Sequence, residues 1–311
     1  MEQVETRALK ISQWGNLGMA LAGIVAAWAS NSQSLMMDGL FSGVGFLSAI
    51  AAIRIARNAS RGPDRDRPFG YAADEAIYKT FRSLALLGLV MFGLTNAVLN
   101  ILRYASGGEP PALEFGPIVV YAVAVSIVCF GLAWTHRRAW IRTGRKSGML
   151  KLEMHAALYD GAVTVVAGVA LLAAPFLTKT ALAPIVPVAD SVVLLFLCGF
   201  AITGYFVTFR GGLAELAGAT AHPDDILSVS RVVRPLLKEV GARLIDLAMI
   251  RTGRTDQIVL YISPGQAMTG GEIDALTKRL QAALLVADRE AAILVVLSEQ
   301  GRTGPTNEAE T

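Results

Sequence analysis

Long apolar stretches fill most of the first 210 residues and constrain the fold more than any other feature of this 311-residue chain. The hydrocarbon core of a bilayer is about 30 Å thick, and a helix needs about 20 apolar residues to cross it. Only 17% of all residues are charged, whereas soluble domains average roughly 25%. We therefore predict an integral, multi-pass membrane protein with six spans, at 11–30, 35–56, 77–105, 116–136, 150–176 and 189–209.

Basic residues gather in two of the loops between these spans. Arginines and lysines crowd the segments 54–82 and 137–151, whereas the opposite side carries Arg103 and Lys179. Loops rich in lysine and arginine stay in the cytoplasm. The asymmetry and the even number of spans predict that both chain termini are cytoplasmic. We interpret the basic clusters as signals of orientation, and we expect membrane lipid rather than nucleic acid as a partner.

The composition changes after residue 210, where charged residues return at the density of a soluble domain. We predict a linker at 211–221, a second domain at 222–300 and a disordered tail at 301–311. Periodicity predicts the order αββαβ in the second domain, with elements at 223–240, 244–251, 257–263, 269–286 and 292–297. The fold class is thus an all-α bundle of six transmembrane helices, residues 1–210, followed by an α+β domain.

Three local patterns refine the prediction for this second domain. Thr269-Gly-Gly-Glu272 is a capping box at the start of a helix. Asp246 and Asp256 are expected on the solvated surface. Residues 253–256 are expected to form a hairpin turn between the first two strands.

Carboxylates inside the predicted spans are the strongest functional signal. A charge at the centre of a span costs roughly 2.5–3.5 kcal/mol on insertion scales, so it needs a partner or a purpose. Asp38 lies on the second span and Asp160 on the fifth. At about 100° per residue, Ser42 shares the face of Asp38 one turn later. Two such faces, each with a carboxylate at mid-depth, would form an oxygen-rich site for a divalent cation.

Other polar residues surround this predicted pair. Glu153 and Thr164 share the face of Asp160, whereas His155 lies roughly 140° away around the helix. We expect Asp38, Asp160, Ser42 and His155 as candidate ligands, and Asn16, Tyr159, Glu153 and Thr164 around them. Packing on a neighbouring face is the alternative for His155, and hydrogen bonding between helices is the alternative for Asn16. Asp190, at the membrane edge, is expected to be a structural group at a helix start.

Several motifs together resemble the cation diffusion facilitator family of divalent-metal transporters. They are Ser34-Leu-Met-Met-Asp38-Gly-Leu-Phe-Ser42, Asp160 on the fifth span, Phe69-Gly70-Tyr71 before Glu75, and the αββαβ tail. The resemblance implies a tetrahedral site built by two positions one turn apart on each of the second and fifth helices. It also implies metal/proton antiport, location in the cell inner membrane, and a homodimer formed through a metallochaperone-like cytoplasmic domain and the transmembrane helices.

The match to the family's ligand positions is partial. Ser42 stands where the family carries an acid or histidine, and Ala156 stands one turn before Asp160, with His155 displaced by one residue. Oxygen ligands suit harder dications such as manganese, whereas imidazole suits zinc. The residues therefore disfavour a tight zinc site and suit harder dications such as manganese or magnesium. Manganese, iron, cobalt and zinc all stay open as substrates, with protons as the counter-ion.

Two further functions compete with cation efflux. A membrane scaffold or regulator that has lost transport would also account for Ser42 and Ala156. A transporter of protonatable organic cations would use the two acids as counter-charges. We predict no enzyme, and neither a catalytic nor a cofactor-binding site, because no nucleophile, base and orienting group gather in one loop.

Overall fold

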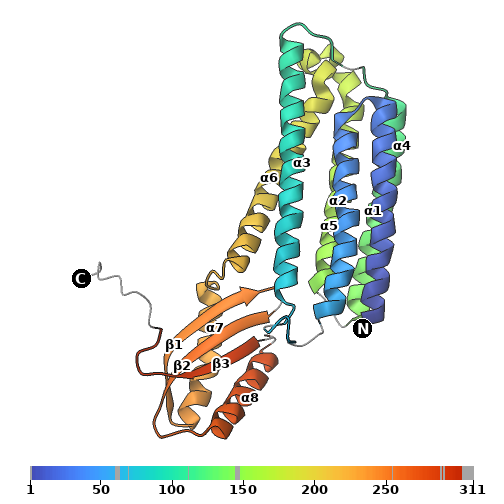
Figure 1. Cartoon of the computed structure of the whole chain (residues 1–311). Coiled ribbons are helices and arrows are strands. Elements are labelled where there is room, and N and C mark those ends of the chain that lie inside the picture. The colour runs from blue at the N-terminus through green and yellow to red at the C-terminus, as the bar shows by residue number, and fades with distance from the viewer. Residues whose placement is uncertain are drawn as a thin grey trace, which may run out of the picture. The chain divides into compact units, whose positions relative to one another are not determined.

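The computed structural model describes residues 2–59, 64–68, 70–110, 112–143, 148–253, 255–287, 289 and 291–302. The chain forms two compact units, which are made of Met1–Ser60 with Tyr78–Phe209 and of Arg61–Ile77 with Arg210–Thr311. The first unit is a bundle of long helices, and the second contains a three-stranded sheet with two helices (Figure 1). The predicted class, a helical membrane bundle with a C-terminal α+β domain, is confirmed.

In its described residues, the bundle contains six long helices and two short 3₁₀ helices. They are α1 (Glu2–Ser30), α2 (Gln33–Ala59), α3 (Ala73–Ala105), α4 (Phe115–Arg142), α5 (Gly148–Ala173), η1 (Ala174–Lys179), η2 (Ala183–Val188) and α6 (Ala189–Leu216). Among the described residues, the helical segments of α2 to α6 are the five that are long and apolar enough to cross a membrane. The sequence predicts six spans, but Ser12, Gln13 and Asn16 dilute the apolar part of α1 below that level.

The helices α1 and α2 approach each other at two glycines. A Cβ atom placed on Gly23 would lie 2.5 Å from the Cα atom of Gly39, so any larger residue at either position would force the backbones apart. Small residues allow this kind of close packing between membrane helices. The same Cβ position lies 3.0 Å from the hydroxyl of Tyr121 on α4. Three helices therefore meet around Gly23.

The carboxylate of Asp190 joins the start of α6 to the start of α2. Its oxygens accept hydrogen bonds from the Ser32 hydroxyl at 2.6 Å, from the Gln33 amide at 2.7 Å and from the Ser34 amide at 3.3 Å. The Ser34 hydroxyl donates to the Asp190 carbonyl at 3.0 Å. The first amides of a helix have no partner within it. Asp190 is thus a structural group, and it caps α2 rather than its own helix.

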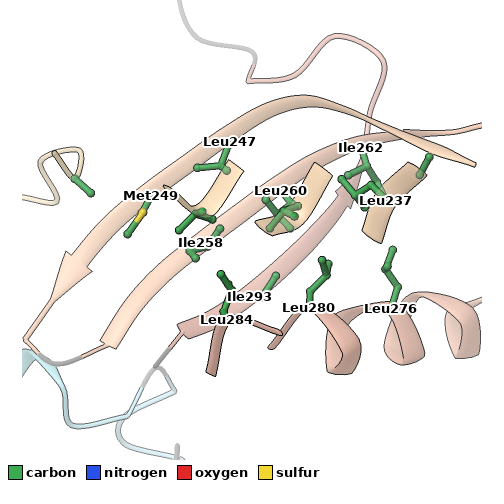
Figure 2. Packing of buried hydrophobic residues seen from close by; sticks show 14 residues of the cluster. Leu237, Leu247, Met249, Ile258, Leu260, Ile262, Leu276, Leu280, Leu284 and Ile293 are labelled. Carbon is green, nitrogen blue, oxygen red and sulfur yellow. The ribbon is translucent and has the colours of Figure 1, made fainter. Parts of the chain in front are cut away.

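The second unit has the order α7 (Pro223–Glu239), β1 (Ala242–Thr252), β2 (Thr255–Pro264), α8 (Gly270–Val286) and β3 (Ala291–Leu297). This is the predicted αββαβ order, and the capping box of Thr269 and Glu272 is present. Strand β2 is central, antiparallel to β1 and parallel to β3, because α8 carries the chain back across the sheet. Every second residue of β2 and every fourth residue of α8 enter one core (Figure 2).

The predicted linker at 211–221 is partly helical. Helix α6 continues to Leu216, because Leu213, Ala214 and Glu215 favour a helix despite the two glycines before them. Gly218 ends the helix with a φ of +67°, which glycine adopts without steric cost. The amide of Ala219 donates to the carbonyl of Ala214, as in a Schellman motif.

The prediction that Asp256 lies on the solvated surface is wrong. Its side chain faces the same side of β2 as the core residues, and the residue is 6% exposed. Arg289 donates a hydrogen bond to Asp256 at 3.0 Å and another to Asp225 at the start of α7. The ion pair makes this buried position tolerable for a carboxylate. Strand alternation predicts the inward face, but it does not predict the partner.

Candidate functional site

A cavity of about 650 Å³ lies within the bundle, and residues from all six long helices line it. The cavity brings together all eight residues that the sequence analysis named. They are Asn16 on α1, Asp38 and Ser42 on α2, and Glu153, His155, Tyr159, Asp160 and Thr164 on α5. The two predicted faces on α2 and α5 therefore line one space.

The carboxylate of Asp38 is held by residues of two other helices. The Tyr121 hydroxyl on α4 donates to its Oδ2 atom at 2.7 Å. The Thr164 hydroxyl on α5 lies 3.4 Å from the same oxygen and 2.9 Å from the carbonyl oxygen of Asp160. A threonine hydroxyl has one proton to donate, so it can bond only one of these two oxygens at a time. These contacts place Asp38 of α2 beside the Asp160 turn of α5.

The carboxylate of Asp160 has no such support. Within the described part of the chain, no side chain or amide donates a hydrogen bond to it, and it is accessible from the cavity. Its closest electrostatic partners are Asp38, Arg82 and Glu153. Two neighbouring carboxylates with free lone pairs attract a cation, and oxygen ligands of this kind suit hard dications.

The ligand set around the two acids is poor in nitrogen and sulfur. In the described ranges, no group of three or more histidine, cysteine, aspartate or glutamate side chains is placed to hold a metal ion. Ser42 and Ala156 line the cavity at the positions one turn from Asp38 and Asp160. A cation between the two acids would therefore take its remaining ligands from hydroxyl groups, backbone carbonyls or water.

The other predicted residues line the cavity in different ways. The Nδ1 atom of His155 lies 2.8 Å from the Lys151 carbonyl oxygen and donates a hydrogen bond to it. The ring of Tyr159 stacks on Phe200 of α6, with 6.1 Å between the ring centroids. Asn16 packs against Gly45 of α2, where a Cβ atom would lie 3.2 Å from its Nδ2 atom.

Arg82 is a charged cavity residue that the sequence analysis assigned to a basic loop. The structure places it inside α3, where Nη1 donates to the Tyr78 hydroxyl at 3.0 Å and lies 3.6 Å from Oε1 of Glu153. Tyr78 also hydrogen-bonds Ser48 of α2. The sequence signal that could have identified Arg82 was its position, which is nine residues after the start of α3 rather than in the loop before it.

Tyr121 is the second residue that sequence reasoning missed. It lies in the uninterrupted apolar run of α4, where a tyrosine gives no sign of a polar contact. Its hydroxyl reaches Asp38 because Gly23 leaves room beside it. Helix packing, rather than any local motif, thus adds α4 to the site.

Comparisons with known proteins give one family match and two distant relatives. The model of the cation efflux transmembrane domain matches residues 9–217 of the chain. The chain is 23% identical over 120 residues to the manganese efflux system protein MneP of Bacillus subtilis (strain 168), covering 39% of this chain and 40% of that protein. It is 29% identical over 128 residues to the uncharacterized transporter MJ0449 of Methanocaldococcus jannaschii, covering 41% and 43% of the two chains. The matched segments span about two fifths of these relatives.

Proposed function

The chain belongs to the cation efflux family, whose members are transporters rather than enzymes, and from that premise we propose that it exports a divalent metal cation in exchange for protons. The observation that carries the proposal is the meeting of Asp38 and Asp160 in one cavity, where Asp160 has no hydrogen-bond donor among the described residues. An acid without a donor inside a bilayer is expensive unless a ligand neutralises it.

Manganese is the substrate that we propose. Asp38 and Asp160 offer carboxylate oxygens, Ser42 offers a hydroxyl, and these hard ligands suit manganese better than zinc. One of the two relatives described above is a manganese efflux protein, and its identity to this chain is 23% over 120 residues. His155 lies on the cavity wall and imidazole suits zinc, so zinc, iron and cobalt are the competitors that must be tested against manganese.

Exchange follows from the chemistry of the two carboxylates. A lone pair of a carboxylate oxygen binds either a proton or a metal ion, so the two cations compete for Asp38 and Asp160. If the bundle opens the cavity alternately to the two sides, protons entering from outside displace the metal that came from the cytoplasm. We also propose that both termini lie in the cytoplasm, as the basic loops predict.

We also propose that two copies of the chain associate through their C-terminal domains and transmembrane helices. Strand β3 buries Ile293 in the core and leaves Leu294 57% exposed and Val296 36% exposed on its other face. An apolar sheet face of this kind is suited to a second copy. Chemical cross-linking of the full chain in membranes would test it, and a monomer at every concentration would contradict it.

The test of the transport function uses purified protein in liposomes. Manganese-driven proton movement is expected to fall at least about tenfold in both Asp38→Asn and Asp160→Asn, since each removes one anionic ligand. Glu109→Gln, which changes an exposed acid in the loop after α3, is the matched control and is expected to keep wild-type flux. Competition among manganese, iron, cobalt and zinc then identifies the substrate.

Three results would contradict this function. Undiminished exchange in both aspartate variants would remove the proposed site. Cation binding without flux in the wild type would support the scaffold or regulator instead. Flux of an organic cation with no dependence on a dication would support the transporter of organic cations.

A further inference from the structure

We propose that Arg82 is an internal competitor of the transported cation: it occupies the negative potential of the cavity while no dication is bound, and Glu153 holds it away from Asp160 when one is. The inference rests on the proposed function, because it assigns Arg82 and Glu153 the role of setting the affinity of that same site. Both residues are positioning residues, and neither is proposed as a ligand.

The position of the Arg82 side chain is the first support. It lines the cavity and is 26% exposed, with its guanidinium 3.0 Å from the Tyr78 hydroxyl and 3.6 Å from Glu153. The distance to Glu153 is longer than that of a direct hydrogen bond, so the pair is held loosely. A permanent positive charge therefore lines the cavity without being locked to one carboxylate.

The spacing of the acids on α5 is the second support. Glu153 and Asp160 are seven residues apart, which is two turns and about 10 Å along one face of the helix. Arg82 interacts electrostatically with both of them. The guanidinium thus faces a ladder of two carboxylates, with Glu153 nearer the start of α5 and Asp160 nearer Asp38.

The other basic side chains that line the cavity are less suited to this role than Arg82. Lys79, one turn before Arg82 on α3, also lines the cavity and has a partner of its own. The side chain of His155 is engaged with a backbone carbonyl. Among the described lining residues, Arg82 is therefore the fixed cation whose negatively charged partners are the acids of α5.

Opposite effects on affinity are the signature of an internal competitor. Without the guanidinium, a dication no longer meets a repelling charge, so it binds more tightly and leaves more slowly. Without the Glu153 carboxylate, the guanidinium is released toward Asp160, so the dication binds more weakly. An ion pair that only supports the fold would make both changes act in the same direction.

The experiment measures manganese binding by calorimetry on the detergent-purified full chain and flux in liposomes. Arg82→Gln is expected to lower the Kd about tenfold and to lower both the KM and the turnover rate. Glu153→Gln is expected to raise the Kd about fivefold. In the Arg82→Gln background, Glu153→Gln is expected to have little further effect, because the group that it would release is gone.

Two control variants keep the test decisive. Arg82→Lys retains the charge and should stay within about twofold of the wild-type Kd even if Arg82→Gln folds poorly. Arg103→Gln removes an arginine from the exposed far end of the same helix and should leave the Kd unchanged. Unchanged or weakened binding in well-folded Arg82→Gln would overturn the inference alone. A wild-type chain that binds no dication would overturn the proposed function, and the inference with it.

Discussion

Two aspartates of the same bundle, Asp190 on α6 and Asp160 on α5, show that an acid in a membrane helix can have two opposite roles. The carboxylate oxygens of Asp190 accept hydrogen bonds from one hydroxyl and two backbone amides, and the residue is 6% exposed. The carboxylate of Asp160 receives no hydrogen bond from any described residue and is accessible from the cavity. The number of donors around an acid of the bundle therefore separates a structural group from a candidate ligand better than the acid itself does.

The largest effect is expected when Asp190, the structural member of the pair, is replaced. Asp190→Ala removes the acceptor for the Ser32 hydroxyl and for the amides of Gln33 and Ser34, so it should destabilise the bundle by about 2–4 kcal/mol. Asp160→Asn removes an unsupported charge and should leave stability unchanged or raise it. Thermal unfolding of both variants in the same detergent, without added metal, measures the difference.

The addition of manganese gives a second test of the difference between Asp160 and Asp190. The melting temperature of the wild type and of well-folded Asp190→Asn should rise with metal concentration, because a ligand that binds the native state stabilises it. The melting temperature of Asp160→Asn should not. Equal destabilisation by Asp160→Asn and Asp190→Ala would show that the distinction by donors is false.

An intermediate effect is expected from a substitution of Tyr121. Its hydroxyl donates a hydrogen bond to Asp38, so Asp38, like Asp190, has a donor. Tyr121→Phe removes the 2.7 Å hydrogen bond that orients the Asp38 carboxylate. We expect the affinity for manganese to fall about tenfold, since partners that orient a metal ligand contribute that much. Calorimetric titration checks it, with Tyr104→Phe near the end of α3 as the matched control. Unchanged affinity would mean that the Tyr121 hydroxyl does not orient Asp38 for binding.

The smallest effect is expected outside the bundle, where acids are paired with arginines. Hydrogen bonds from Arg289 and Arg302 lower the pKa of Asp225 and of Asp246 respectively below the usual aspartate value. A lowered pKa contributes stability that is complete above the unfolded pKa of about 4 and is lost as the pH falls through the folded value. Each pair is expected to contribute under about 1 kcal/mol.

Hydrogen exchange across the second unit of the full chain, corrected for the intrinsic rate at each pH, measures this loss. Protection of α7 and β1 should decline below about pH 4. Arg302→Gln should flatten the decline that is due to Asp246, because its partner is then absent at every pH. An identical decline in wild type and variant would show that this pair does not contribute.

The fold was largely predictable, because its elements follow from local periodicity. Apolar runs of span length predict the bundle, strand alternation predicts β2, and the Thr269–Glu272 pattern predicts the start of α8. The end of α6 was missed because two glycines interrupt its pattern. The first predicted span is a helix, but its polar residues keep it less apolar than the others.

The candidate site was predictable only where the sequence of a single helix indicates the role of a residue. Asp38 and Asp160 stand out because a charge in an apolar run is costly. Tyr121 and Arg82 were missed because their roles depend on which helices pack together. The donors to Asp190 were missed for the same reason, since Ser32 lies 158 residues away in the chain. Contacts between helices, rather than motifs within them, decide which acids stay free.

The contact of Gly23 with Gly39 has a mechanical consequence for any opening of the cavity. With no side chain between the two backbones, α1 and α2 cannot turn past each other at this point without first separating. The Tyr121 hydroxyl rests in the same notch, so a separation there would also loosen its hold on Asp38. A single methyl group added at position 23 of α1, a helix that carries neither Asp38 nor Asp160, would thus disturb the Asp38 carboxylate.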